Sequence, residues 1–309
     1  MRILSTFLKL ITAIVLIAIA GGLVWKRYDD RRLLLLGAGR PAGSVVKRQI
    51  DPETGWGTVT LADWEGNPLP CRIAIPTGPP PEGGFGCVIA NYGIGQRVNF
   101  FNKLAPFFTR RGLVFLMPEQ YGCGERHLTN AGFFETHYAP RKRAARLVAE
   151  TRLWVDFVET LPEVDRCRID YLGISYGGIV GATLLAKEPR FRNAVFVMAG
   201  GNIPLMLNGL LSHYYSKSFW VPLAASLGGW WLAPFEPLEQ LPKANVQRLL
   251  FLAVEPDELI PPESRQALVR AATVPFIKRV YPGPHTTPNP DTVAQMVEDL
   301  IDWLKASPR

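Results

Sequence analysis

Short apolar segments that alternate with helix-length stretches constrain the fold of this 309-residue chain more than any other feature of its sequence. Each segment has the length of one buried strand. The segments are 85–91, 112–117, 168–174, 193–199, 248–254 and 276–281. This alternation predicts an α/β domain with a mostly parallel sheet, helices on both faces of the sheet, and functional loops at the carboxyl ends of the strands.

The residues before this alternation favour antiparallel strands. SVVKRQIDPETGWGTVTL (44–61) and LPCRIAIPTG (69–78) are extended segments in which Gly, Asp and Pro mark turns. With 48% apolar and 20% charged residues, the chain has the composition of a protein that buries a substantial core. We therefore treat residues 44–309 as one domain.

A serine at the centre of GISYG marks the most specific motif of the chain. The apolar segment 168–174 leads into it, and a helix-like stretch rich in small residues follows. Gly173 and Gly177 flank Ser175 at the two positions where a Cβ would clash in a turn tight enough to expose the hydroxyl. The pattern predicts that Ser175 is a nucleophile; the alternative is a solvated serine in a glycine-rich loop.

A serine nucleophile needs a base that removes its proton, and histidine is suited to this role. His285 lies in a loop rich in Pro and Gly, directly after the last apolar segment. A carboxylate must in turn orient the imidazole. The loop after the preceding segment supplies Glu255, Asp257 and Glu258. We predict that Asp257, which precedes apolar residues, is the acid and that the two glutamates are solvated surface charges.

Attack of the serine on a carbonyl group creates an oxyanion, which preorganised backbone N–H groups stabilise. One donor is expected to be the amide of Tyr176, directly after the nucleophile. The second is expected in NYGIG, after the first buried strand, where Ile94 is our first choice and Gly95 the second. The glycines of this stretch also suit an ordinary turn between a strand and a helix.

These motifs resemble those of the α/β-hydrolase superfamily, and the resemblance extends over nearly the whole chain from Ser44. GISYG is similar to its nucleophile elbow, EPDELIP to its acid loop and PGPHTTP to its histidine loop. NYGIG is similar to its His-Gly-x-Gly oxyanion stretch, with Tyr92 in place of His. The resemblance implies an eight-stranded sheet with a cap after the sixth strand. It is strongest to the dienelactone-hydrolase, acetyl-esterase and prolyl-oligopeptidase-like group.

A long connection, about 201–244, interrupts the alternation of strands and helices. Its first part, 201–235, has no Asp or Glu and carries several aromatic residues, among them Trp220 and Trp230. An insertion of this length and composition suits a cap that covers a pocket and admits apolar substrates. The alternative is that its aromatic side chains pack a small core of the insertion itself.

The first 32 residues are expected to direct the chain to a membrane. Ile3 to Trp25 is apolar apart from Lys9 and has enough residues to cross a bilayer, for which about 20 are needed. We favour a retained anchor, because apolar residues continue beyond Ala20, where a signal peptide would be cleaved to give an exported soluble form. Basic residues after the span favour a cytoplasmic domain, whereas a signal-like N-terminus favours export, so the side of the membrane stays open.

The net charge of +7 could suggest a nucleic-acid partner, but we expect none, because the basic residues are scattered apart from one cluster. Arginines are concentrated in 140–152, where we expect them on the solvated face of a helix whose buried stripe holds Leu147, Trp154 and Val158. The four cysteines lack C-x-x-C spacing, so neither a metal site nor a disulfide framework is indicated. They are Cys71, Cys87, Cys123 and Cys167.

The motifs favour a serine hydrolase that cleaves small apolar carboxylic esters through an acyl-enzyme, without a cofactor or a metal. A peptidase or amidase of the same fold is the first alternative, because the same three residues serve both reactions. Such an enzyme needs a polar clamp on the peptide, for which Glu119 and Glu125 are the candidates. The second alternative is a membrane-tethered binding protein without catalysis.

Overall fold

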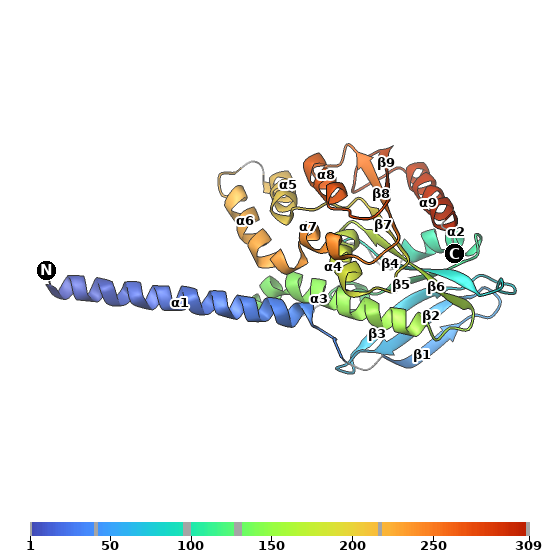
Figure 1. The fold of residues 1–309 in the computed structure, drawn as a ribbon, viewed down its shortest axis with the longest axis horizontal. Helices are drawn as coiled ribbons and strands as arrows, with labels where there is room; N and C mark the ends of the chain where they lie inside the picture. Colours follow the sequence, from blue (N-terminus) through green and yellow to red (C-terminus); the bar gives the residue numbers. More distant parts are fainter. Residues whose placement is uncertain (1, 40–42, 95–99, 127–131, 216–217, 307–309) are drawn as a thin grey trace.

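The computed structural model describes residues 2–39, 43–94, 100–126, 132–215 and 218–306, with the backbone alone for 2–10 and 133–137. Its centre is a nine-stranded sheet with the order β1-β2-β3-β5-β4-β6-β7-β8-β9 (Figure 1). The strands are β1 (Ser44–Ile50), β2 (Trp56–Ala62), β3 (Pro68–Ala74), β4 (Phe85–Asn91), β5 (Leu113–Pro118), β6 (Val164–Ile174), β7 (Asn193–Val197), β8 (Arg248–Glu255) and β9 (Phe276–Pro282). The six strands from β5 to β9 in this order are parallel, and β1 to β3 extend the sheet in antiparallel register.

The sheet therefore has one strand more than the eight that the family resemblance implied. Residues 44–61 form two strands because the sequence between them makes a tight turn. In this turn the Gly55 amide donates to the Asp51 carbonyl at 2.8 Å, and Gly55 has a φ of +70°. Strand β1 is the additional strand, at the edge of the sheet.

Helices cover both faces of the sheet, as the alternation of segments predicts. The helices that connect or follow the strands are α2 (Phe101–Thr109), α3 (Phe133–Val158), α4 (Tyr176–Lys187), α8 (Pro262–Arg270) and α9 (Pro290–Lys305). Side chains of β4 alternate between two cores: Cys87 and Ile89 pack on the side of α3 and α4, Val88 and Ala90 on the side of α2 and α9. Burial on both faces explains why β4 is apolar from Phe85 to Ala90.

Helix α3 confirms one prediction and corrects another. Leu147, Trp154 and Val158 are buried, as their spacing predicts. Arg141 and Arg146, however, are not on a solvated face: their side chains are 0% and 5% exposed and form ion pairs with carboxylates of other segments. The sequence could not show this, because those carboxylates are distant along the chain.

The connection between β7 and β8 forms several helices in the place of the expected insertion. They are α5 (Ile203–Tyr215), α6 (Val221–Leu232), α7 (Pro237–Gln240) and the 3-10 turns Ala233–Phe235 and Leu241–Lys243. Helix α5 packs against α6. On its other side, Ile203 and Met206 of α5 form a small apolar cluster with Ile260, which follows β8. We call the segment 201–244 the cap; it contacts the loop that holds Asp257.

A single long helix, α1 (Arg2–Leu34), precedes the sheet and projects from the body of the molecule (Figure 1). Its stretch Ile11–Leu34 is long and apolar enough to cross a membrane, a property that signal sequences share. The side chains of Ile11 to Val24 are exposed, whereas Leu33 is buried in the core beside α3. The end of α1 is thus part of the folded body.

Candidate active site

Ser175 occupies a sharp turn between β6 and α4. Its backbone has φ +50° and ψ −113°, a conformation that residues other than glycine rarely adopt. The turn is held by the Ser175 amide, which donates to the Val197 carbonyl of β7 at 2.7 Å. The strand-turn-helix context that G-x-S-x-G requires is therefore present.

The two flanking glycines are required by close packing of the backbone around the turn. A Cβ on Gly173 would lie 2.7 Å from the Cα of Gly178, and a Cβ on Gly177 would lie 2.1 Å from the carbonyl oxygen of Asn91. Both distances are too short for a side chain. This is the physical reason for the spacing seen in the sequence.

The structure brings Ser175, His285 and Asp257 together. The Nε2 atom of His285 lies 2.9 Å from the Oγ atom of Ser175. Its Nδ1 atom lies 3.1 Å from each oxygen of the Asp257 carboxylate. The three residues follow β6, β8 and β9, and the parallel order of these strands places their carboxyl ends at one edge of the sheet.

The Asp257 carboxylate is held by its own loop. The amides of Leu259 and Ile260 donate to its Oδ1 atom at 3.0 and 2.8 Å. The side chains of Asp257 and His285 are 0% and 8% exposed. A buried carboxylate in this position fixes the imidazole orientation and stabilises the charge that forms when the ring takes a proton.

Glu258 corrects the expectation of a solvated surface charge. Its carboxylate accepts hydrogen bonds from the His285 amide at 2.7 Å, from the Thr286 amide at 2.9 Å and from the Thr286 hydroxyl at 2.6 Å. It therefore ties the histidine loop to the acid loop. Sequence reasoning missed this role, because only the fold brings Glu258 beside residues that follow β9.

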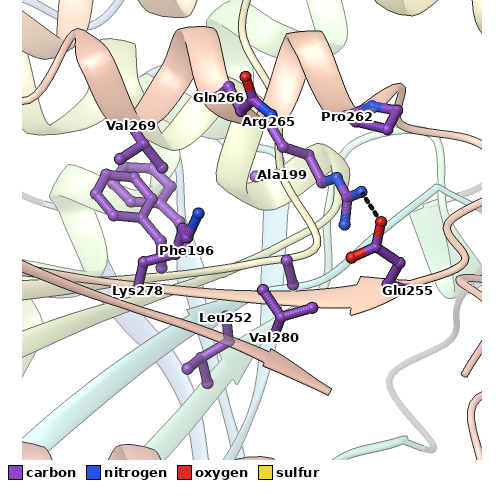
Figure 2. A pocket seen from close by; sticks show the side chains of 12 residues that line it. Phe196, Ala199, Leu252, Glu255, Pro262, Arg265, Gln266, Val269, Lys278 and Val280 are labelled. Atoms are coloured by element: carbon purple, nitrogen blue, oxygen red, sulfur yellow. Dashed lines mark ion pairs between the residues drawn. The ribbon is translucent and has the colours of Figure 1, made fainter. Parts of the chain in front are cut away.

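Glu255, the other glutamate considered for the acid, has a different environment. It pairs with Arg265 of α8 at 3.8 Å, and its side chain is 64% exposed (Figure 2). Both residues border a cavity of about 110 Å³ between α8 and the sheet, which Phe196, Phe251 and Val269 also line. Among the residues that line this cavity there is no Ser175, Asp257 or His285.

The two predicted oxyanion donors differ in what the structure describes of them. Tyr176 is the first residue of α4, so its amide belongs to the first helical turn, whose N–H groups have no partner within the helix. Ile94 follows β4 in a turn and is 64% exposed. Gly95, the second choice for this donor, lies outside the described residues. The role of both donors stays a prediction.

Tyr92, which replaces the histidine of the family motif, is fully buried at the end of β4. Its hydroxyl donates to the Glu119 carboxylate at 2.7 Å and accepts from the Gln120 amide at 3.1 Å. The Gln120 side chain donates to the Tyr92 carbonyl at 2.9 Å. Burial is the main cause that raises the pKa of Tyr92 well above its ordinary value, so this phenol stays protonated as a donor. The network fixes the start of the NYGIG stretch.

A serine hydroxyl that is hydrogen-bonded to an imidazole, which is in turn hydrogen-bonded to a buried carboxylate, can form an acyl-enzyme and pass the acyl group on to water. The sheet order and the position of the serine between β6 and α4 define the α/β-hydrolase fold, and the chain has this fold. The family resemblance predicted it correctly.

Comparison with known proteins agrees with this fold. No family model matches the sequence, and no curated protein matches it by sequence. The structure is similar to acetyl xylan esterase from Paenibacillus sp. R4, with a TM-score of 0.68 and 16% identity over 91% of this chain and 94% of that one. Acetyl xylan esterase 1 from Thermoanaerobacterium sp. JW/SL YS485 has a TM-score of 0.65 and 15% identity over 88% and 93% of the two chains. A puromycin-hydrolyzing peptidase from Mycobacterium tuberculosis has a TM-score of 0.65 and 17% identity, over 83% of this chain and 40% of the peptidase.

Proposed function

We propose that the protein is a serine hydrolase that cleaves carboxylic esters. The observation that carries the proposal is the 2.9 Å contact between Ser175 Oγ and His285 Nε2 on a strained strand-to-helix turn, with Asp257 behind the imidazole. Two of the similar structures are esterases by name, which agrees with ester chemistry on this fold. No step of the proposed mechanism needs a cofactor.

In the first half of the reaction, Ser175 Oγ attacks the acyl carbon while His285 Nε2 takes its proton. Asp257 stabilises the resulting imidazolium. The amides of Tyr176 and Ile94 are proposed to hold the oxyanion. His285 then gives the proton to the alcohol oxygen as the C–O bond breaks, which leaves an acyl-enzyme on Ser175.

In the second half, water attacks the acyl-enzyme. His285 takes a proton from this water, and the second tetrahedral intermediate collapses with return of the proton to Ser175 Oγ. The carboxylic acid leaves, and the starting state of the three residues is restored. In both halves of the reaction, His285 Nε2 first accepts a proton from the attacking oxygen and then donates it to the leaving oxygen.

A peptidase is the second candidate, because one similar structure is a peptidase by name. Glu119, one of the two residues considered as a peptide clamp, is 4% exposed and accepts a hydrogen bond from the Tyr92 hydroxyl. Its carboxylate is therefore engaged inside the domain, which favours the ester reaction. Comparison of rates on p-nitrophenyl acetate and on aminoacyl p-nitroanilides distinguishes the two.

The test of the proposal combines labelling with turnover. A fluorophosphonate should label the wild-type protein once, on Ser175, and should not label Ser175→Ala. Turnover of p-nitrophenyl acetate should fall by on the order of a million-fold in Ser175→Ala, with an unchanged melting temperature. Wild-type protein that is folded but neither labelled nor active would instead support a binding protein.

We also propose that α1 is retained as a membrane span, so that the domain stays attached to the bilayer. The apolar run continues through the predicted cleavage position to Trp25, and the helix is continuous across it. Carbonate extraction of membranes that contain the full chain, together with mass measurement of its N-terminus, tests this. Release of a chain that starts at Gly21 would show a cleaved signal peptide.

A further inference from the structure

Helix α6 is apolar except for Ser226, yet only one of its faces is buried. Its sequence, VPLAASLGGWWL, contains no charged residue. Val221, Ala225 and Gly229 form the buried face. The opposite face, which we call the α6 stripe, consists of Trp220 and three residues of the helix, spaced three to four positions apart. These residues and their exposed fractions are Trp220 (38%), Leu223 (63%), Leu227 (56%) and Trp230 (47%).

An exposed apolar stripe of this length is unusual for a helix in water, since surface helices carry polar residues on their outer face. The neighbouring residues extend it: Phe219 is 96% exposed, and Tyr214 and Tyr215 are 64% and 58% exposed. Contiguous apolar surface of this kind marks a binding surface. The question is what covers it.

Aromatic contacts attach the C-terminal end of the stripe to α1. The rings of Trp25 and Trp231 stack with their centroids 6.0 Å apart. The Lys26 ammonium lies 4.7 Å from the centroid of the Trp230 ring. Trp25, Leu227 and Trp231 also line one groove of about 990 Å³ between α1, α3 and α6. Charged residues of α1, α3 and the 62–68 turn line the rest of this groove, namely Arg32, Glu65, Lys142 and Arg146. Trp25, Trp231 and Leu227 nevertheless connect the apolar surface of α1 with the α6 stripe.

A buried ion-pair cluster fixes the direction of α1 relative to the cap. The Arg141 guanidinium of α3 lies 2.9 Å from Asp29 and 2.6 Å from Asp30, both in α1. The side chains of Arg141 and Asp29 are 0% and 2% exposed. Arg141 also donates to the Trp231 carbonyl at the end of α6. One guanidinium therefore joins α1, α3 and α6, and a buried charge of this kind cannot be separated cheaply from its partners.

The exposed apolar part of α1 ends at Trp25, beside the residues through which α1 contacts α6. From Ile11 to Trp25 the helix is exposed and uncharged, and Lys26 is the first charged residue after it. Aromatic residues and lysines at such a boundary are typical of the membrane–water interface. Figure 1 shows α5 and α6 on the side of the body from which α1 projects.

We propose that the α6 stripe lies in the interfacial region of the same bilayer that α1 spans. The proposal rests on the proposed membrane span of α1. Because α5 packs on the loop that holds Asp257, the cap then connects the bilayer surface to the carboxyl ends of the strands, where Ser175, Asp257 and His285 lie. The substrates favoured by this arrangement are esters dissolved in the lipid phase.

The test uses the full chain in phosphatidylcholine vesicles with an environment-sensitive fluorophore. Cys123 and Cys167, the cysteines that are not buried, are first replaced by Ser. The fluorophore is then attached to Leu223→Cys or, as the matched control, to Val46→Cys. The two positions are 63% and 64% exposed, and β1, which holds Val46, lies away from α6 (Figure 1).

Emission from position 223 should shift to the blue in vesicles and should be quenched by brominated lipids, while emission from position 46 stays water-like. Water-like emission from position 223 in a chain that resists carbonate extraction overturns the proposal and leaves the span intact. A blue shift without lipid quenching also overturns it, and indicates that a second copy of the chain covers the stripe. A chain removed by carbonate refutes the span and, with it, this proposal.

Activity gives a second measurement that does not depend on the fluorophore. Leu223→Glu should reduce hydrolysis of an ester carried in the vesicles by about tenfold or more, because an interfacial carboxylate opposes burial. The same variant should hydrolyse soluble p-nitrophenyl acetate at the wild-type rate. Val46→Glu should leave both rates unchanged. Equal rates for Leu223→Glu and wild type on the vesicle-borne ester would overturn the proposal.

Discussion

Three carboxylates within four residues, Glu255 to Glu258, have different environments, and their hydrogen bonds and ion pairs distinguish them. Asp257 is buried against the imidazole of His285, Glu258 accepts from the backbone of the histidine loop, and Glu255 pairs with Arg265. Only Asp257 can orient the imidazole in this geometry. Asp257 is therefore the proposed catalytic acid, Glu258 positions the histidine loop, and Glu255 is a surface charge.

Asp257→Asn should leave a folded enzyme whose turnover is reduced by about ten-thousand-fold, because the amide favours the wrong tautomer of His285. Glu255→Gln is the matched control, since it makes the same chemical change two residues away. It should retain near-wild-type turnover on p-nitrophenyl acetate. The reverse pattern, an inactive Glu255→Gln and an active Asp257→Asn, would assign the acid to Glu255.

Glu258 provides a prediction that depends on pH. Its partial burial opposes ionisation, but the hydrogen bonds from Thr286 and the His285 amide outweigh this effect and lower its pKa from 4.5 to about 2. Since the folded-state pKa lies below the unfolded value, the carboxylate stabilises the fold above pH 4.5. This contribution is lost as the pH falls from 4.5 to about 2.

At pH 6, Glu258→Gln should melt about 2–4 °C below the wild type. The difference should shrink as the pH falls and should be small near pH 2, where Glu258 of the wild type is about half protonated. Melting curves of both proteins by circular dichroism between pH 6 and pH 2 measure this. A difference that is constant over this range would mean that the carboxylate charge does not hold the histidine loop.

The sequence was informative where a residue's role follows from its place after a strand. Ser175, Asp257 and His285 each come directly after an apolar segment, so the parallel sheet predicts their proximity, and the structure brings them together. Glu258 and Tyr92 could not be assigned in this way. Their partners lie 27 residues away along the chain, in loops whose contact only the fold determines.

At the scale of elements, apolar periodicity predicted the buried strands β4 to β8 and the buried stripe of α3, because burial is what selects those residues. Residues 276–281 were also expected to form a buried strand, but β9 lies at the edge of the sheet and Tyr281 is its one buried residue. Polar partners have no such periodicity, which is why Arg141 and Arg146 of α3 were misassigned to solvent. The family resemblance also implied one strand too few, whereas the residues 44–61 themselves favoured extended segments separated by a turn, and they form β1 and β2.

The exposure of α6 distinguishes between two interpretations of the aromatic residues in the cap: a surface that admits apolar substrates, or a small core of the cap itself. Trp230 is 47% exposed, so Trp230→Ala should lower the free energy of unfolding by about 1 kcal/mol. Trp154 of α3 is 1% exposed, and Trp154→Ala should cost about 3–5 kcal/mol. Urea unfolding of both variants gives the comparison. Similar losses would mean that Trp230 belongs to a core of the cap itself.

At the scale of the whole molecule, α1 is both a projecting apolar helix and a structural part of the domain. Its exposed part, up to Val24, contacts little else, but Asp29 and Asp30 neutralise Arg141, which is fully buried in the body. Leu33 of α1 packs in the same core as Trp154 of α3. Removal of the apolar helix and removal of the whole N-terminal segment are therefore different changes.

Deletion of residues 1–24 should give a soluble domain that hydrolyses p-nitrophenyl acetate at the wild-type rate. This deletion leaves Ser175, Asp257 and His285 in place and keeps both carboxylates beside Arg141. Deletion of residues 1–32 removes both carboxylates from Arg141 and leaves its charge with the Trp231 carbonyl but without a carboxylate, which costs about 3–5 kcal/mol in comparable cases. Urea unfolding and activity of the two truncated proteins measure the difference.

In the protein that lacks residues 1–32, Arg141→Met should recover part of the lost stability, since it removes the charge that has lost its carboxylates. Equal stability of the two truncations would show that Asp29 and Asp30 do not hold α1 to the domain. A folded but inactive protein lacking residues 1–24 would show that the apolar helix itself contributes to the active site.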